Sequence, residues 1–520
     1  MNIDLATVFL IDDDTEVRRA LQRFTCSVGT LMVRARLSPN ETAIVDRERT
    51  VSYDELFAQA QAVAGRLRAA GVVAGDRVAI YLDKSVEAVA ALYGAWLMGA
   101  VAVPINDGQR SPQVRHIVRH CRAKAFVSRA RLVHRLDPGV TASATVIDVD
   151  AFAGSPAPFR TPASLPDTAP AAILYTSGST GLPKGIVVSH ANLAAGARIV
   201  AQYLGMGHED RILSVLPFNF DYGLNQLLVS VHCGATLFLQ RGTFVPDICD
   251  SLARWEISAL AGVPPLWIQL MQEGSPLAQL ELPKLRLITN SGGVFPVEVI
   301  RQYRRRFPHV AIYLMYGLSE AFRSTYLDPR EIDVRPESMG KAIPETEIWV
   351  VDDEGGLCVP GEVGELVHRG PTVALGYFDD DDATRKVWRP NPFAPNSAER
   401  VVYSGDLVRK DAEGFLYYVG RRDAMIKSYG VRISPQEVEE LVYASELVAE
   451  VVACGEPHAV AGAAVVVHIV PRNTRTFRKQ DLFAHCRKTM PMYMLPKAIY
   501  VHDEFPRTAS GKVDRRRIVP

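Results

Sequence analysis

Eleven residues from Tyr175 to Gly185 have a composition suited to binding phosphate groups. The segment contains three glycines, four serines or threonines and one lysine, Lys184. Glycines let backbone N–H groups approach phosphate oxygens, hydroxyls donate hydrogen bonds or hold a metal-bound water, and a lysine supplies positive charge. The spacing does not match G-x-x-x-x-G-K-[ST], since Gly185 follows Lys184, and no G-x-G-x-x-G opens a helix here. We therefore predict a polyphosphate-binding loop of another type.

A mobile Gly/Ser linker is the alternative for this segment. A linker does not need Lys184, and it does not need to lie between the apolar runs Ala171–Leu174 and Ile186–Val188. The first run has the length and composition of a buried strand, so the polar residues are expected to leave a sheet as a loop.

Three further segments carry side chains suited to a bound nucleotide. In Tyr316-Gly-Leu-Ser-Glu320 the tyrosine offers an aromatic face for adenine, and the glutamate is a ligand of the kind that Mg²⁺ prefers. Asn290-Ser-Gly-Gly-Val294 follows an apolar run and lets the backbone approach the base. Asp406 follows a tight turn and can accept both hydrogen bonds of a ribose diol. Taken singly, each segment also fits an ordinary turn with a core tyrosine, a solvated glutamate or an aspartate bonded to its own backbone.

In this order the segments resemble the motifs of the AMP-forming adenylating superfamily, which groups acyl-CoA synthetases, amino-acid adenylation domains and luciferases. The likeness extends from about Leu31 to Lys512. It implies ATP and Mg²⁺ as cofactors and an acyl-adenylate as the intermediate. By resemblance, the residues expected to bind ATP or AMP are Thr176, Ser177, Gly178, Ser179, Thr180, Gly181, Lys184, Gly292, Gly293, Val294, Met315, Tyr316, Gly317, Ser319, Asp406, Arg421 and Lys512.

The same resemblance assigns roles within this set. Lys512, Thr176, Lys184 and Glu320 are the expected catalytic residues, and Glu320 and Thr176 are the expected Mg²⁺ site. Lys512 would orient the carboxylate and the α-phosphate, although without the resemblance a basic C-terminal segment is more often solvated. Arg421 would assist Asp406.

Asp221 carries the argument about the substrate. It matches the aspartate with which amino-acid adenylation domains pair the α-ammonium group of the substrate, and its neighbour Phe220 stands where acyl-CoA synthetases often have histidine. A carboxylate in an apolar pocket is unfavourable unless it finds a cation, so we predict an amino or imino acid as substrate. The alternative is that Asp221 caps a helix that begins at Tyr222.

The acyl pocket is expected to be lined by bulky side chains, which imply a small substrate, with L-proline as the first candidate. The run Met315–Tyr326 resembles stand-alone prolyl-carrier-protein ligases and exosortase-associated acyl-CoA ligases. Arg323 in this run would need a carboxylate partner if it is buried. The candidate lining residues are Phe220, Asp221, Tyr222, Asn225, Val263, Pro264, Trp267, Asn290, Met315, Phe322 and Arg323.

The acceptor is expected to be a pantetheine thiol. No Gly-Gly-x-Ser-type phosphopantetheine site follows the lysine segment, so we expect a separate carrier protein in trans, or free CoA. Two rival functions remain: an acyl-CoA synthetase for a medium-chain or aryl acid, and a non-catalytic nucleotide-binding module.

Composition excludes several other classes of protein. Lys+Arg and Asp+Glu both number 58 in 520 residues, so neither nucleic acid nor an anionic membrane is expected as a partner. The 7 cysteines show no C-x-x-C spacing, so neither a disulfide framework nor a zinc site is indicated, and a cytoplasmic location fits. The apolar stretch Ala88–Pro104 contains two glycines and ends in proline, which favours a buried helix and a short strand over a membrane span.

The elements that must position these residues follow an α/β pattern. Strand-like runs such as Arg77–Leu82 alternate with amphipathic segments such as Tyr53–Ala70, which predicts layered α/β architecture with largely parallel sheets. The resemblance implies a large N-terminal domain at residues 25–419, a hinge at residues 420–424 that contains Asp423, and a small mobile α+β domain at residues 425–520. Residues 1–24, with the acidic run Val8–Asp14, look like the start of a response-regulator receiver domain and are interpreted as an atypical extension.

Overall fold

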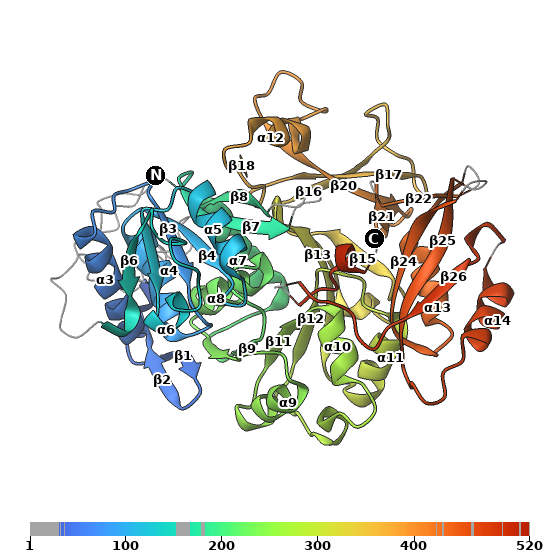
Figure 1. Cartoon of the computed structure of the whole chain (residues 1–520), viewed down its shortest axis with the longest axis horizontal. Helices are drawn as coiled ribbons and strands as arrows, with labels where there is room; N and C mark the ends of the chain where they lie inside the picture. The colour runs from blue at the N-terminus through green and yellow to red at the C-terminus, as the bar shows by residue number, and fades with distance from the viewer. Residues whose placement is uncertain are drawn as a thin grey trace.

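The computed structural model describes residues 31–151, 167–177, 183–422, 424–428, 431–458, 462–490, 492–508 and 511–518, apart from Met32 and Arg36. The chain forms a large N-terminal α/β part and a small C-terminal part, which confirms the predicted fold class (Figure 1). The extension at residues 1–24, the loop residues Gly178, Ser179, Thr180 and Gly181, and the hinge residue Asp423 lie outside the described residues.

The first sheet of the large part positions the polyphosphate segment. Its order is β18-β8-β7-β4-β3-β5-β6, with parallel pairing from β7 through β6 and antiparallel pairing of β8 with β7 and β18. The strands are β3 (Arg77–Tyr81), β4 (Val101–Ile105), β5 (Ala125–Ser128), β6 (Thr145–Asp148), β7 (Pro170–Ser177), β8 (Pro183–Ser189) and β18 (Gly376–Tyr377).

The second sheet joins the large part's remaining strands in the order β16-β17-β20-β21-β15-β14-β13-β12-β11-β9-β10-β1-β2, with β19 on β20. In chain order these are β1 (Thr42–Asp46), β2 (Arg49–Ser52), β9 (Arg211–Ser214), β10 (Thr236–Leu239), β11 (Ala259–Gly262), β12 (Leu287–Asn290), β13 (Ala311–Leu318), β14 (Ala321–Leu327), β15 (Ser338–Ala342), β16 (Glu347–Val351), β17 (Val363–Arg369), β19 (Trp388–Pro390), β20 (Arg400–Lys410) and β21 (Leu416–Arg421).

The prediction of largely parallel sheets is wrong for half of this second sheet. Pairing is parallel from β1 through β13, and it is antiparallel from β13 to β16. The reason is the short connection after β13: two residues, Ser319 and Glu320, separate it from β14, and such a connection can join only antiparallel strands. The turn carries Glu320 to the point where both kinds of pairing meet.

Helices cover the sheets of the large part. The helices are α3 (Tyr53–Ala69), α4 (Val86–Leu97), α5 (Ser111–His120), α6 (Ala130–Val133), α7 (His190–Leu204), α8 (Asp221–Cys233), α9 (Val245–Arg254), α10 (Pro264–Leu270), α11 (Val297–Arg306) and α12 (Asp381–Val387). Every residue of α4 except Glu87 is buried, and a Cβ on Gly94 would lie 2.7 Å from Cβ of Val63 on α3. The apolar stretch is therefore an internal helix followed by β4, as predicted. No helix among the described residues is long and apolar enough to cross a bilayer.

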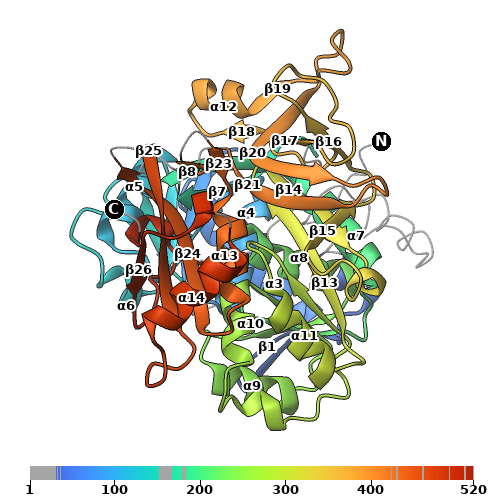
Figure 2. The same ribbon diagram turned by 90° about the vertical axis from the view of Figure 1, so that its right-hand side faces the viewer.

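The small C-terminal part has a sheet and a core of its own. Its elements are β22 (Ile426–Ser428), β23 (Val431–Ile433), α13 (Pro435–Tyr443), β24 (Val448–His458), β25 (Gly462–Pro471), α14 (Lys479–Thr489) and β26 (Ala498–Val501). Apolar side chains from α13, β25 and α14, including Val438, Val467 and Leu482, form its core. Figure 2 shows these elements gathered beside α10 and α11 of the large part.

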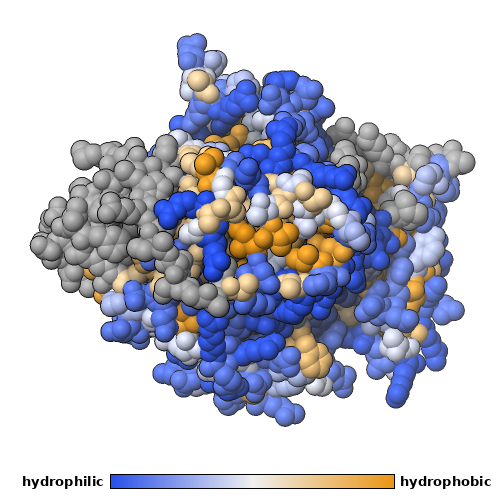
Figure 3. All heavy atoms as spheres, turned by 60° about the vertical axis from the view of Figure 1, so that its left-hand side comes forward, coloured by the Kyte–Doolittle hydropathy of each residue, from blue (hydrophilic) through white to orange (hydrophobic). Residues whose placement is uncertain are grey.

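Figure 3 shows one face of the molecule, which is mostly hydrophilic, with apolar side chains gathered near its middle. Most buried apolar residues of the large part belong to two clusters, and smaller clusters complete its interior. One packs around α3, α4 and the first sheet, and the other packs around α9, α10 and α11. The acyl-pocket candidates Tyr222, Val263, Trp267 and Met315 belong to the second cluster.

Candidate functional site

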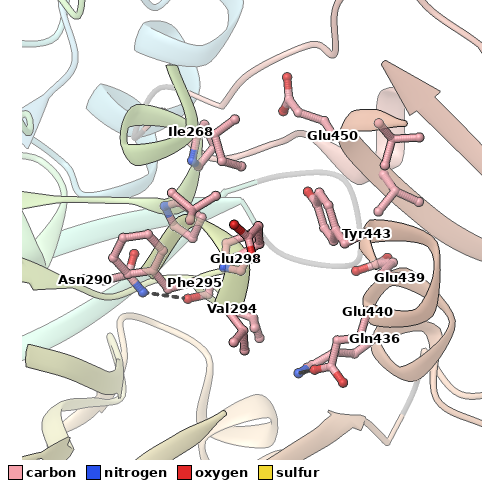
Figure 4. Close-up of a pocket in the computed structure, with 18 of the residues that line it drawn as sticks. Ile268, Asn290, Val294, Phe295, Glu298, Gln436, Glu439, Glu440, Tyr443 and Glu450 are labelled. Carbon is pink, nitrogen blue, oxygen red and sulfur yellow. Dashed lines mark hydrogen bonds between the residues drawn. The ribbon is translucent and has the colours of Figure 1, made fainter. Parts of the chain in front are cut away.

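A cleft of about 1780 Å³ lies between the large and small parts. Ile268, Asn290 and Val294 line it from the large part, and Glu439 and Tyr443 of α13 face them from the small part (Figure 4). The predicted site residues that line this cleft are Pro264, Asn290, Gly292, Gly293, Val294, Met315, Tyr316, Gly317, Asp406, Arg421 and Lys512. Segments far apart in the sequence therefore meet at one place.

Lys512 enters this cleft from the small part. A tight loop presents it: the Thr508 amide donates a 2.7 Å hydrogen bond to the Lys512 carbonyl, and Gly511 has a φ of +84°. A Cβ added to Gly292 would lie 2.5 Å from Cε of Lys512 and 2.9 Å from its Nζ. The missing side chain at Gly292 therefore makes room for the lysine.

Because Lys512 enters the cleft, an aromatic ring and several charged groups surround its ammonium group. Its Nζ lies 4.8 Å from the centre of the Phe220 ring. Burial lowers the pKa of the Lys512 ammonium, while the charges of Asp221 and Asp406 raise it and that of Arg323 lowers it further. The lysine is thus close both to the acyl-pocket candidates and to the predicted ribose carboxylate.

Tyr316 and Asp406 form a hydrogen-bonded pair at the wall of the cleft. The Tyr316 hydroxyl donates to Oδ2 of Asp406, and Nη1 of Arg421 lies 3.3 Å from Oδ1. Burial raises the pKa of the Asp406 carboxyl, while Arg421 and the Tyr316 bond oppose that shift. Asp406 lies inside β20 beside Gly405, which has a φ of +71°, rather than in a free turn that caps its own backbone.

We expect Asp406→Asn to raise the KM for ATP about 10- to 100-fold, because one charge-assisted hydrogen bond to a ribose hydroxyl is lost. The measurement is ATP-dependent pyrophosphate exchange at saturating acid. Asp411→Asn is the control, because Asp411 is also an aspartate that accepts a tyrosine hydroxyl, that of Tyr417. An unchanged KM for ATP in Asp406→Asn would contradict the ribose role.

The described ends of the polyphosphate segment lie near Glu320. Thr176 and Lys184 face each other across the β7–β8 pair. Nζ of Lys184 lies 5.1 Å from the centre of the Tyr377 ring, and the Tyr377 hydroxyl donates a 2.7 Å hydrogen bond to Oε1 of Glu320. The donor set fits a magnesium nucleotide, since hydroxyl and carboxylate oxygens are Mg²⁺ ligands and a lysine meets phosphate charge.

The acyl-pocket candidates surround a buried ion pair. Nη1 of Arg323 on β14 lies 3.3 Å from Oδ2 of Asp221 on α8, and the two side chains are 2% and 5% exposed. The Arg323 guanidinium also lies 4.8 Å from the centre of the Tyr222 ring. The carboxylate that a buried Arg323 requires is therefore Asp221.

This pair corrects two sequence predictions about Asp221. The argument that Asp221 requires a substrate ammonium group is wrong, because Arg323 already supplies a cation. The capping alternative is wrong as well. Helix α8 begins at Asp221 itself, its N-cap is Phe220, and no side chain caps it.

Two nitrogens of Arg323, Nε and Nη2, are buried and have no hydrogen-bond partner within the described residues. The same holds for Nδ2 of Asn225, which lies with the Phe322 ring beside Gly196. Buried polar groups are normally hydrogen-bonded, so these unpaired donors favour a polar ligand at this place.

Two comparisons of sequence now bear on this site. Residues 31–378 match the model of the AMP-binding enzyme family, and residues 437–512 match that of the AMP-binding enzyme C-terminal domain. The chain belongs to the AMP-binding enzyme family. The first match covers the β7–β8 pair, the acyl-pocket candidates and Glu320, and the second ends at Lys512.

Full-length relatives of this AMP-binding enzyme are ligases. An L-proline–[L-prolyl-carrier protein] ligase of Pseudomonas fluorescens is 32% identical over 92% of this chain and 95% of its own length. An indoleacetate–CoA ligase of Aromatoleum aromaticum is 31% identical over 93% and 96%. The solved O-succinylbenzoate coenzyme A synthetase of Bacillus subtilis, in complex with ATP and magnesium ion, has a TM-score of 0.84 at 28% identity and covers 94% of this chain and 98% of that chain. This AMP-binding enzyme is therefore an AMP-forming ligase that uses ATP and Mg²⁺.

Sequence reasoning missed some residues of this candidate site. Tyr377, which holds Glu320, was not foreseen, and neither was His368, which is fully buried and stacks on Tyr316 at 6.0 Å between ring centres. Burial lowers the pKa of His368 to about 3. A tyrosine in a two-residue strand and a histidine in β17 carry no sequence signal for these contacts, because each contact is made across strands that are distant in the chain.

Proposed function

We propose that this ligase activates a small amino or imino acid with ATP and passes the acyl group to a pantetheine thiol. The observation that carries the proposal is the position of Lys512, which lies against Gly292 and beside Phe220, with Asp406 contributing to its electrostatic surroundings. A positioned cation stabilises the negative charge that develops at the α-phosphate during adenylation.

The proposed reaction has two steps. A carboxylate oxygen of the acid attacks the α-phosphorus of ATP, and pyrophosphate leaves. The thiolate sulfur then attacks the acyl carbonyl carbon, and AMP leaves with the bonding electrons of the C–O bond. Lys512 attends the first step, Asp406 and Arg421 bind the ribose, and Tyr316 and the Gly292–Gly293 backbone bind adenine.

Magnesium and the triphosphate are proposed to bind at the β7–β8 pair and the turn after β13. Glu320 and Thr176 are the proposed Mg²⁺ ligands, and Lys184 is the proposed partner of the phosphates. A bound Mg²⁺ neutralises phosphate charge and orients the leaving group. The chain's own contribution is to hold Glu320 in place through Tyr377 and Lys184 beside Asp380, whose Oδ2 lies 3.9 Å from Nζ.

L-proline is the first acid to test, with support from the name of the Pseudomonas relative and from the bulky, buried side chains of the acyl-pocket candidates Tyr222 and Trp267. A second candidate is an acyl-CoA synthetase for an aryl or medium-chain acid. The Asp221–Arg323 pair favours it, because Asp221 no longer requires a cationic substrate.

The proposed acceptor is the phosphopantetheine thiol of a separate carrier protein, with CoA as the rival, and the proposed location is the cytoplasm. The proposed organisation is a large domain at residues 25–419, a hinge around Asp423 and a lid at residues 425–520, whose reorientation would separate the two steps. Support comes from the sheet topology, since the third sheet begins at Ile426.

ATP–pyrophosphate exchange tests this proposal, because exchange reports the first step whatever the acceptor is. We expect Mg²⁺-dependent exchange with at least one small amino or imino acid in a panel that also contains medium-chain and aryl acids. Exchange with an aryl or medium-chain acid alone would select the second candidate, and no exchange with any acid would contradict the proposed reaction. Thioester formation with holo-carrier protein or with CoA then identifies the acceptor.

A further inference from the structure

The guanidinium of Arg323 uses only part of its hydrogen-bonding capacity. Its Nη1 lies 3.3 Å from Oδ2 of Asp221 and donates to the Phe322 carbonyl at 2.7 Å. Its Nε and Nη2 are buried and have no partner within the described residues. Donors that are buried without a partner are strongly unfavourable, so a group that satisfies them contributes directly to binding.

The two unpaired nitrogens define the kind of group that would satisfy them. Nε and Nη2 form one edge of the planar guanidinium, and their N–H bonds point in parallel. That fork matches the two oxygens of a carboxylate in a bidentate arrangement. A single hydroxyl or carbonyl oxygen would leave one donor unpaired.

The Nε–Nη2 edge of Arg323 and Lys512, which is proposed to orient the activated carboxyl group, are linked by two aromatic rings. The ring centres of Phe220 and Tyr222 lie 6.1 Å apart. Lys512 lies against the first ring at 4.8 Å, and Arg323 lies against the second at 4.8 Å. A short acid along this aromatic pair would have one end at Lys512 and the other at Arg323.

We propose that the substrate is a short amino acid with a second carboxylate, and that this carboxylate binds side-on to Nε and Nη2 of Arg323. The ammonium group of the substrate would face Asp221, whose Oδ2 lies 3.3 Å from Nη1 of Arg323. The inference deepens the proposed function and rests on it. Arg323 is on this basis the residue that determines specificity.

Matched pairs of acids test the inference on the unaltered enzyme. ATP–pyrophosphate exchange is measured with L-glutamate against L-glutamine and with L-aspartate against L-asparagine, with L-proline as a further reference. We expect one carboxylate to exceed its amide about 100-fold or more in kcat/KM, because the amide places an N–H₂ group against the guanidinium edge. If the amides or L-proline give a kcat/KM equal to that of the acidic amino acids, the inference is overturned, while the proposed function is not contradicted.

A variant of Arg323 tests whether the two parallel donors, rather than the positive charge, determine the preference. Arg323→Lys keeps a cation for Asp221 but removes the parallel donors, so the preference for carboxylate over amide is expected to fall at least about tenfold. Arg198→Lys, at the partly exposed pair with Glu345, is the matched control and should leave the preference unchanged. An unchanged preference in Arg323→Lys would overturn the inference. If that variant does not fold, the matched pairs on the unaltered enzyme still decide. No exchange with any acid would instead remove the proposed function itself.

Discussion

Replacing Lys512 by alanine is expected to lower the rate of ATP–pyrophosphate exchange about 100- to 1000-fold, because a positioned cation is lost where negative charge develops. The lysine is already inside the cleft, within van der Waals reach of Gly292, so no rearrangement of the large part is needed for it to act. In the proposed mechanism this cation acts in the first step and not in the transfer from acyl-adenylate to the thiol. That transfer is therefore expected to change much less when the adenylate is supplied chemically.

Two further variants make the result specific to the position of the lysine. Lys497→Ala removes an exposed lysine of the same small part and should leave exchange unchanged. Gly292→Ala keeps Lys512 but places a methyl group 2.5 Å from its Cε at a residue with a φ of +79°, so exchange is expected to fall through displacement of the lysine and strain in the backbone together. Normal exchange in both Lys512→Ala and Gly292→Ala would contradict the role of the lysine.

The pH profile of exchange gives an independent signature of Lys512. Burial lowers the pKa of its ammonium group below the ordinary 10.5. The charged form acts in the proposed step, so activity is present below the lowered pKa and is lost as the pH rises through it. The alkaline limb of the profile should consequently fall at a lower pH than an ordinary lysine gives, and Lys512→Arg should move that limb upwards, since arginine keeps its charge.

The second large effect is on stability and concerns Asp221 and Arg323. Removing one partner leaves a buried, uncompensated charge, so Arg323→Met and Asp221→Leu are each expected to destabilise the large part by about 3–5 kcal/mol. The double variant Asp221→Leu/Arg323→Met buries no charge. Its loss should therefore be smaller than the sum of the two single losses by at least about 2 kcal/mol.

Urea unfolding followed by tryptophan fluorescence measures this coupling, since Trp267 lies in the same buried cluster as Tyr222. Only the transition of the large part is compared, because a chain with two parts need not unfold in one step. A matched control is the more exposed pair of Arg330 and Asp328. Exposed ion pairs contribute about 0–1 kcal/mol to stability, so little coupling is expected there. If the losses of unfolding free energy in the two single variants add up to the loss in the double variant, Asp221 and Arg323 do not stabilise each other.

Local signals in the sequence foretold the elements that carry the nucleotide residues. The apolar run Ala171–Leu174 lies within β7, the segment Val86–Leu97 is a buried helix, and Asn290 ends a strand before the two glycines. These predictions succeeded because hydrophobic periodicity and glycine positions act over a few residues. In the fold, the elements predicted in this way place Gly292, Tyr316, Asp406 and Lys512 at one cleft.

Pairings over long sequence separations could not be predicted in the same way. Asp221 and Arg323 were each singled out, yet a single sequence carries no information that a helix N-terminus and a strand 102 residues later face each other. From the sequence alone, the aspartate is therefore matched with a substrate cation and the arginine has no identified partner. The antiparallel half of the second sheet was missed for a related reason, since strand direction depends on connections rather than on composition.

The depth of the Asp221–Arg323 pair has a consequence for the order of events. Both side chains are almost fully shielded from solvent, and neither lines the cleft into which Lys512, carried by the small part, inserts. The inserted lysine lies 4.8 Å from the centre of the Phe220 ring. With the proposed reorientation of the small part, we therefore expect the acid to bind before Lys512 inserts, and a saturating acid to slow the withdrawal of the lysine from the cleft.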